Sequence, residues 1–215
     1  MKGRLLVRGK FITLEGPDGS GKSTIIKLLE DYLENKGIEY IITREPGGTE
    51  IGEEIRHLIL DKGNTNMGPE TEALLLAAAR AQHVHEKILP ALEAGKHVFC
   101  DRFTLSSLAY QGVGRDLGIE NVKFINDFGI RGIYPDLILF FHVDAELTLE
   151  RKIGNLEGDR LELEGSEFHK RVYQGYMKLL KLYPDNIELI DASRSIEEVL
   201  EQSIEKIEQI FRGND

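Results

Sequence analysis

The chain of 215 residues has a single cysteine, no tryptophan and no long run of apolar residues. Cys100 has no second cysteine to pair with, so an internal disulfide is excluded, and we expect this thiol to be a small buried apolar group. No segment approaches the roughly 20 apolar residues that cross a bilayer, and the first residues lack the apolar core of a secretory signal. These absences predict a cytoplasmic protein that does not bind membranes.

Positive charge is also scarce. Lysine and arginine together number 27 against 37 aspartates and glutamates, which gives a formal net charge of −10. Proteins that bind DNA, RNA or anionic lipid over a broad face cluster their cations on it. We therefore expect small-molecule ligands and no nucleic acid, with any phosphate binding confined to a local site.

Five short segments rich in β-branched and aromatic residues predict buried strands. They span residues 11–15, 39–43, 97–101, 137–143 and 187–190. Segments with apolar residues at helical spacing lie between them, and Ser195 with Glu198 forms a capping box at the start of the last one. This alternation predicts an α/β fold of three layers, a doubly wound, five-stranded parallel sheet in a single domain over residues 1–215.

The stretch GPDGSGKST follows the first predicted strand and precedes a predicted helix. It matches the pattern G-x-x-x-x-G-K-[ST], whose glycines let backbone N–H groups turn inward around phosphates, while the helix start, the lysine and the hydroxyl add charge and a magnesium ligand. We expect these residues to bind a nucleotide: Gly16, Pro17, Asp18, Gly19, Ser20, Gly21, Lys22, Ser23 and Thr24.

Other motifs narrow the class of phosphate-binding protein. The guanine-reading string Asn-Lys-x-Asp of GTPases is absent. Residues 127–129 read Asp-Phe-Gly, as in protein kinases, but no accompanying His-Arg-Asp is present, so we treat that match as coincidence. These absences disfavour a hydrolysing switch, and the phosphate loop by itself does not decide between a kinase and a motor.

Arginines follow two neighbouring predicted strands. Arg44 lies in TREPGGT after the second strand and Arg102 lies in CDRF after the third. Ligands of open parallel sheets bind beyond the carboxyl ends of the strands, so both guanidinium groups are candidate phosphate ligands. Asp101, at a strand end, could hold a magnesium-bound water or steer an arginine, and Ser23 and Asp101 are the candidate metal residues; Arg56 is a further candidate cation.

Further candidates come later in the chain. Arg80 lies on an apolar helix, and Ser107 and Gln111 in SSLAYQG offer polar groups to a heterocycle. Residues 150–165 are polar and glycine-containing, which suits a mobile lid whose Arg151 and Arg160 act on the transferring phosphoryl group. His83 and His85 lack metal-ligand spacing, and we interpret both as structural.

Taken together, FITLEGPDGSGKST, TREPGGT, RAQH, CDRF, SSLAYQG and the Asp-Arg pair at 159–160 resemble the thymidylate kinase family over nearly the whole chain. The resemblance implies the nucleoside monophosphate kinase fold, Mg-ATP as the phosphoryl donor, conversion of dTMP to dTDP in the cytoplasm, and a homodimer.

The resemblance also assigns roles by position. Asp18 matches the carboxylate that meets the acceptor's sugar, and Arg44 and Arg102 match cations at its phosphate. Arg80, Ser107 and Gln111 match residues at the thymine ring. Gly19 stands where one subclass has an arginine in the phosphate loop, which leaves the lid arginines as the catalytic cations; the bond before Pro46 is expected to be cis.

Two positions depart from the family pattern. Leu76 stands where a phenylalanine usually stacks on thymine, and Phe103 replaces a commoner tyrosine. Leucine covers a base without the ring's quadrupole. A kinase for dUMP or UMP therefore stays open beside the dTMP kinase, as does a nucleotide-binding module without catalysis.

Overall fold

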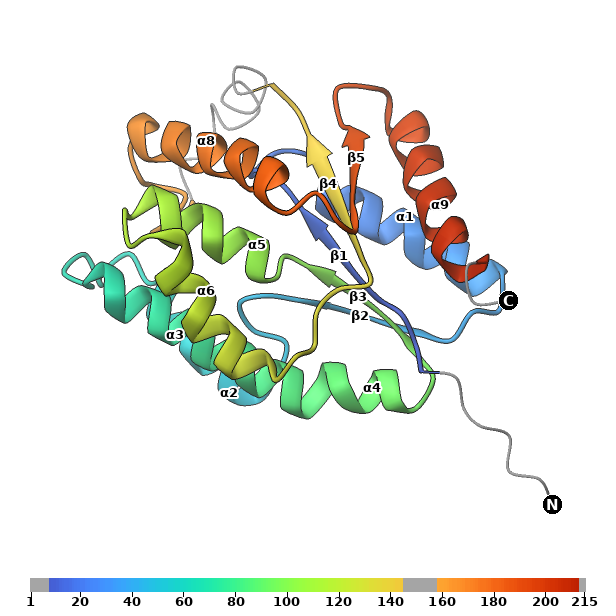
Figure 1. Cartoon of the computed structure of the whole chain (residues 1–215), viewed down its shortest axis with the longest axis horizontal. Helices are drawn as coiled ribbons and strands as arrows, with labels where there is room; N and C mark the ends of the chain where they lie inside the picture. Colours follow the sequence, from blue (N-terminus) through green and yellow to red (C-terminus); the bar gives the residue numbers. More distant parts are fainter. Residues whose placement is uncertain (1–7, 145–157, 213–215) are drawn as a thin grey trace.

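The structure is a computed structural model that describes residues 8–144 and 158–212. Its centre is a parallel sheet of five strands in the order β2-β3-β1-β4-β5 (Figure 1). The strands are β1 (Phe11–Glu15), β2 (Tyr40–Arg44), β3 (His97–Asp101), β4 (Leu137–His142) and β5 (Ile187–Asp191). The predicted strands and fold class are confirmed, because no strand boundary differs from its prediction by more than one residue.

Two helices cover one face of the sheet. These are α1 (Lys22–Asn35) and α9 (Ile196–Arg212), which lie side by side in Figure 1. Ile12 and Leu14 of β1 point into this layer, where they pack with Ile25 and Leu29 of α1. The predicted capping box of α9 is confirmed, since Ser195 N donates to Glu198 Oε2 at 3.0 Å and Glu198 N donates to Ser195 Oγ at 3.2 Å.

The other helices lie over the opposite face (Figure 1). They are α2 (Glu50–Leu60), α3 (Pro69–His83), η1 (Val84–Ile88), α4 (Leu89–Glu93), α5 (Thr104–Ser107), η2 (Leu108–Gly114), α6 (Ile119–Ile130) and α8 (Ser166–Leu182). Phe11 and Cys100 face this layer, in a cluster with Val84 and Ile88, and Phe140 packs with Tyr176 in a second cluster. Cys100 is fully buried, as predicted.

The strand order places the candidate residues together. β1 lies between β3 and β4, so the chain leaves β1 toward one side of the sheet and later returns to the other, which opens a crevice at the carboxyl ends of these strands. The glycine loop follows β1, Arg44 ends β2, and Asp101 ends β3. No helix within 8–144 or 158–212 has the length and apolarity to span a membrane.

Candidate active site

The glycine loop joins β1 to α1 through backbone conformations that favour glycine. Gly16 has φ +140°, and a Cβ there would lie 2.7 Å from the carbonyl oxygen of Phe141. Gly21 has φ +90° and precedes α1, which has no side-chain cap at its first turn. The open start of α1 therefore points its N–H groups at the site, where an anion can accept from them.

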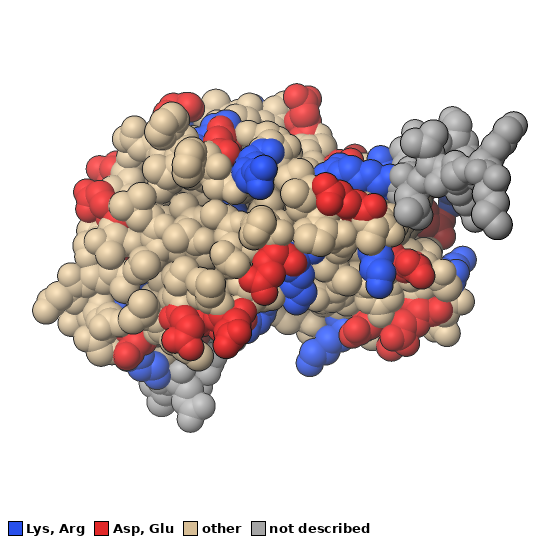
Figure 2. All heavy atoms as spheres, turned by 90° about the horizontal axis from the view of Figure 1, so that it is seen from below, with Lys and Arg blue, Asp and Glu red and all other residues tan. Residues whose placement is uncertain are grey.

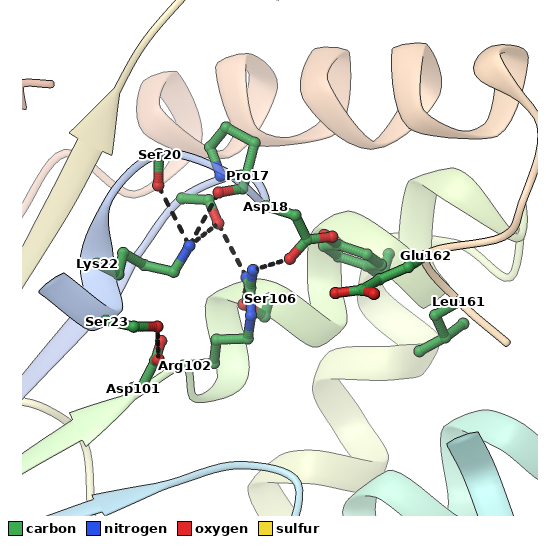
Figure 3. Close-up of polar contacts among 12 residues, drawn as sticks. Pro17, Asp18, Ser20, Lys22, Ser23, Asp101, Arg102, Ser106, Leu161 and Glu162 are labelled. Atoms are coloured by element: carbon green, nitrogen blue, oxygen red, sulfur yellow. Dashed lines mark hydrogen bonds and ion pairs between the residues drawn. The ribbon is translucent and has the colours of Figure 1, made fainter. Parts of the chain in front are cut away.

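Lys22 is the buried cation of this loop. Its Nζ donates to the carbonyl oxygens of Gly16 and Pro17 at 3.0 and 2.9 Å and to Ser20 Oγ at 3.2 Å (Figure 3). Burial disfavours the charged form and Arg102 repels it, and together they lower the pKa of Lys22 to about 8. The ammonium is thus held over the loop by bonds that phosphate oxygens can replace.

Ser23 and Asp101 fit a magnesium ion. Ser23 Oγ donates to Asp101 Oδ2 at 3.4 Å (Figure 3). The second carboxylate oxygen of Asp101 is buried and has no hydrogen-bond partner among the residues that the structure describes. A hydroxyl and a carboxylate are the oxygen donors that Mg²⁺ takes from proteins, together with waters and phosphates. The predicted pair therefore meets at the carboxyl end of β3 with a vacant acceptor.

Arg102 crosses from β3 to the loop. Its Nη1 donates to the Gly16 carbonyl at 2.9 Å, to Ser106 Oγ at 3.0 Å and to Tyr176 OH at 3.2 Å. Its Nη2 pairs with Asp18 (Figure 3). Its backbone has φ +68°, which a non-glycine residue adopts at a cost of about 1–3 kcal/mol. The four side-chain bonds hold Arg102 in this strained conformation, and residues of this kind are concentrated at functional sites.

Glu15, which the sequence reasoning missed, anchors the turn that carries Arg102. It is fully buried at the end of β1; its Oε1 accepts from Phe103 N at 2.8 Å and its Oε2 from Ser106 Oγ at 2.6 Å. Burial raises its pKa to about 7, against the opposing effect of these hydrogen bonds. Its place directly before the glycine loop is the signal that would have found it.

The other predicted phosphate cations lie across the crevice. Arg44 donates to the carbonyl of Pro46 at 2.8 Å and to both carboxylate oxygens of Glu53 at 3.0 Å, and Arg56 donates to the same carbonyl at 3.0 Å. The bond between Glu45 and Pro46 is cis, as expected. The turn after β2 therefore gathers both guanidinium groups around one backbone oxygen.

Arg80 lies at the far end of the site and is held on all sides. It donates to Glu45 at 2.6 Å, to Ser107 Oγ at 3.0 Å and to the Phe103 carbonyl at 3.1 Å, and it also bonds to Asn126. The side chains of Arg80 and Glu45 are both only 3% exposed. Sequence reasoning did not select Glu45 or Asn126: Glu45 lies in TREPGGT, where only Arg44 was chosen, and Asn126 lies in no motif.

His83 belongs to the same buried layer. Its two ring nitrogens lie 2.8 Å from Thr43 Oγ1 and 3.0 Å from Glu45 Oε1. Glu45, His83 and Cys100 place potential metal ligands within 4.8 Å of one another. Arg80 already neutralises Glu45, however, and Thr43 engages the other side of His83. These contacts support the structural interpretation of His83.

One cavity of about 540 Å³ brings the predicted residues together. Its lining includes Lys22 and all of the predicted substrate and metal ligands: Asp18, Ser23, Arg44, Arg56, Leu76, Arg80, Asp101, Arg102, Ser107 and Gln111. The segment after residue 157 contributes Asp159, Leu161 and Glu162, which the sequence reasoning had not chosen. Figure 3 shows Leu161 and Glu162 on the opposite side of the site from Lys22.

Of the two arginines of the predicted lid, only Arg160 lies among the described residues, and it is not in that lining. Arg151 lies outside the described residues. Arg160 donates to the Ile59 carbonyl at 2.7 Å and to Glu72 Oε2 at 2.7 Å. Its catalytic role stays a prediction, because the side chain is engaged beside the cavity.

Comparison with known proteins agrees with this geometry. The family model described as thymidylate kinase matches residues 14–203. The chain is 59% identical over 199 residues to the thymidylate kinase of Finegoldia magna, covering 93% of this chain and 98% of that protein. It is 51% identical over 197 residues to the thymidylate kinase of Clostridium novyi (91% and 96% covered), and 47% identical over 209 residues to that of Geobacillus sp. strain WCH70 (96% and 100% covered). The chain belongs to the thymidylate kinase family.

Proposed function

We propose that the protein transfers the γ-phosphoryl group of ATP to dTMP and releases dTDP and ADP. The observation that carries the proposal is the single cavity of about 540 Å³ that contains both the glycine loop and the arginines at the ends of β2 and β3. An anion cradle and a second cluster of cations in one cavity suit two phosphorylated substrates placed end to end. The similar proteins are named thymidylate kinases, which indicates thymine and its sugar as the remaining parts of the acceptor.

The donor binds at the glycine loop in this proposal. Backbone N–H groups at the start of α1 and the Lys22 ammonium hold the ATP phosphates, and Ser23 and Asp101 hold Mg²⁺. The ion, when bound, neutralises charge on the phosphate oxygens. Two observations support this duty: Asp101 Oδ1 is buried without a hydrogen-bond partner among the described residues, and Asp101 Oδ2 lies 3.4 Å from Ser23 Oγ.

The acceptor lies across the rest of the cavity. Arg102 and Arg44 direct the phosphate of dTMP toward the loop, and Asp18, fixed by Tyr110 OH at 2.9 Å, meets the sugar. Leu76, Arg80, Ser107 and Gln111 surround the base. Phosphoryl transfer requires little covalent help from the protein, so alignment of the two oxygens and stabilisation of spread negative charge account for the rate.

We also propose that residues 150–165 act as a lid on this single domain and that Arg151 and Arg160 complete the site. Arg160 must then leave Glu72 and the Ile59 carbonyl when the lid closes. The free energy needed to break these two hydrogen bonds of Arg160 is offset when the guanidinium group forms new charged hydrogen bonds to a phosphate group.

An ADP-release assay across nucleoside monophosphates tests the function. We expect ADP to appear only when dTMP is added with Mg-ATP, and much more slowly with dUMP, UMP and dCMP. ADP release without any monophosphate would make the protein a hydrolase, and equal rates with UMP would make it a general pyrimidine kinase. A protein that binds ATP and releases no ADP with any acceptor would be a binding module.

A homodimer is the assembly that we propose, with α3 and α6 as its contact. Phe124 and Phe128 of α6 are 76% and 87% exposed, and Leu74 of α3 is also exposed. In Figure 2, which views the molecule from below these helices, a broad stretch of the surface has no Lys, Arg, Asp or Glu side chains. An apolar patch of this kind on a soluble domain marks an interaction surface.

Light scattering of Phe128→Lys tests the dimer, with Leu189→Lys as the matched control, because Leu189 is an exposed apolar residue on β5, far along the chain from α6. We expect wild type and Leu189→Lys to run as dimers and Phe128→Lys as a monomer. A monomeric wild type overturns the assembly.

We place the protein in the cytoplasm, where a free buried thiol such as Cys100 stays reduced.

A further inference from the structure

Glu72 is a buried carboxylate of α3 whose oxygens accept from two other segments of the chain. Gln111 Nε2 donates to Oε1 at 2.9 Å and Arg115 Nε donates to the same oxygen at 3.1 Å. Oε2 accepts from Arg115 Nη2 at 2.9 Å and from Arg160 Nη2 at 2.7 Å. Four donors thus surround a side chain that is 1% exposed.

These contacts keep Glu72 ionised. Burial alone disfavours its charge, but hydrogen bonds from Arg115 and Gln111, with the nearby positive charge, outweigh burial and lower the pKa of Glu72. An ionised carboxylate accepts hydrogen bonds and has none to donate. Whatever faces Glu72 must therefore be a donor.

The orientation of the Gln111 amide follows from this rule. Only its NH₂ group can face Glu72, so its carbonyl oxygen has to point the other way. No hydrogen bond to that oxygen occurs among the described residues, and Gln111 lines the substrate cavity together with Leu76 and Arg80. The amide consequently presents its carbonyl oxygen to the cavity as an acceptor, while Glu72 holds one of its two N–H groups.

We propose that Glu72 is a positioning residue that sets the base specificity of this enzyme through Gln111. The inference rests on the proposed function, in which the base lies beside Gln111. Thymine and uracil carry an imide N–H at ring position 3, which the Gln111 oxygen can accept. Cytosine has a lone pair at that position, which faces the same oxygen without a proton between them and is rejected.

Arg115 makes the carboxylate rigid. Its guanidinium group donates to both oxygens of Glu72. These two charged hydrogen bonds remain when Arg160 leaves Glu72 on lid closure, so Glu72 cannot rotate to release the amide without breaking them. A functional group held by such a surrounding shell keeps its direction when the substrate arrives.

Glu72→Gln tests the proposal through the ratio of kcat/KM for dTMP to kcat/KM for dCMP. The side-chain amide of the variant has a single oxygen, which accepts from the arginines. Its NH₂ group then faces Gln111, and the Gln111 amide flips so that its own oxygen accepts from that group. We expect the ratio to fall about tenfold to a hundredfold, the effect of mismatching one buried hydrogen bond. The KM for ATP should stay near its wild-type value. Because both acceptors are assayed on one preparation, the fraction of folded enzyme cancels from the ratio.

Glu164→Gln is the matched control, because it also removes a carboxylate from Arg115 but does not contact Gln111. We expect its ratio to equal that of the wild type. In a Gln111→Ala background, Glu72→Gln should leave the ratio unchanged, since the amide through which it acts is gone. Equal losses for dTMP and dCMP in Glu72→Gln would overturn the proposal and leave Glu72 a structural residue.

A second measurement uses the wild-type protein and needs no turnover. In ¹⁵N-labelled protein, the Gln111 side-chain amide protons, assigned by their loss in Gln111→Ala, should exchange with water far more slowly than those of exposed Gln174. Equal exchange would show that the amide is not held by Glu72. Absence of dTMP kinase activity with a protected amide would refute the proposed function alone, whereas dTMP kinase activity with an unchanged ratio in Glu72→Gln would refute the role of Glu72 alone.

Discussion

The two ends of the substrate cavity are built in different ways. The phosphate end centres on residues 16–24, one continuous stretch with glycine conformations and an open helix start, and Arg44 and Arg102 lie beside it. The base end is assembled from Glu45, Arg80, Gln111 and Asn126, which belong to four separate segments. An anion can be held by backbone groups of a short loop, whereas a base requires side chains that distant residues hold in place.

The arginines at the two ends of the cavity also differ in how firmly their side chains are held. Arg44 at the phosphate end is 46% exposed and can reorient toward a ligand. Arg80 at the base end is fully engaged by a carboxylate, a hydroxyl, an amide and a backbone carbonyl. Arg44 is thus able to exchange its partners for a ligand, whereas Arg80 serves mainly to fix the shape of the wall.

Removing the loop cation gives the largest expected effect. Lys22→Ala removes the buried ammonium that donates to the carbonyl oxygens of Gly16 and Pro17 and that, in the proposed function, binds the ATP phosphates. We expect kcat for dTMP phosphorylation to fall by at least about a thousandfold, as with other cations at transferring phosphates. Titration calorimetry with dTMP should show acceptor affinity within about threefold of wild type, since the base end is intact. Normal turnover would refute the assignment of the loop.

The buried pair at the base end should matter more for folding than the exposed pair at the phosphate end. Glu45→Ala leaves Arg80 charged in a site where both side chains are 3% exposed, and we expect a loss of about 3–5 kcal/mol in the free energy of unfolding. Glu53→Ala is the matched control, because it removes the partner of exposed Arg44 and should cost under about 1 kcal/mol. Urea denaturation measures the free energy of unfolding of both variants. Equal losses in Glu45→Ala and Glu53→Ala would contradict the distinction between the two ends.

The same contrast explains what the sequence could predict. Residues 16–24, the strands and the arginines after β2 and β3 follow from local patterns and from the rule that parallel strands end at one edge. The Glu72–Gln111 and Arg80–Asn126 bonds join positions 39 and 46 residues apart, so no motif contains both members. Arg160 has the charge of a lid cation, but only the fold shows that Glu72 holds it beside the cavity.

Raising the pH should first weaken the binding of ATP at the phosphate end. The pKa of Lys22 is lowered to about 8 by burial and by Arg102, so the free enzyme loses this charge above that pH. We expect kcat/KM for ATP to fall about tenfold per pH unit above pH 8, while kcat changes less because bound phosphates keep the ammonium charged. Initial rates between about pH 6.5 and 9.5 test this. A profile for ATP that stays flat across this range would show that Lys22 keeps its proton throughout.

The smallest effect is expected at Leu76, where the base end lacks an aromatic ring. Leu76 lies in the cavity wall one helical turn before Arg80, and a phenylalanine there would add ring stacking on the base worth about 0.5–1.5 kcal/mol. We therefore expect Leu76→Phe to lower the KM for dTMP about twofold to tenfold, with the KM for ATP unchanged. Leu76→Met, which has similar volume and no ring, should leave both constants near wild type. A KM for dTMP that rises in Leu76→Phe would mean that the wall is shaped for leucine, and that the space beside Arg80, not stacking, sets the affinity for the base.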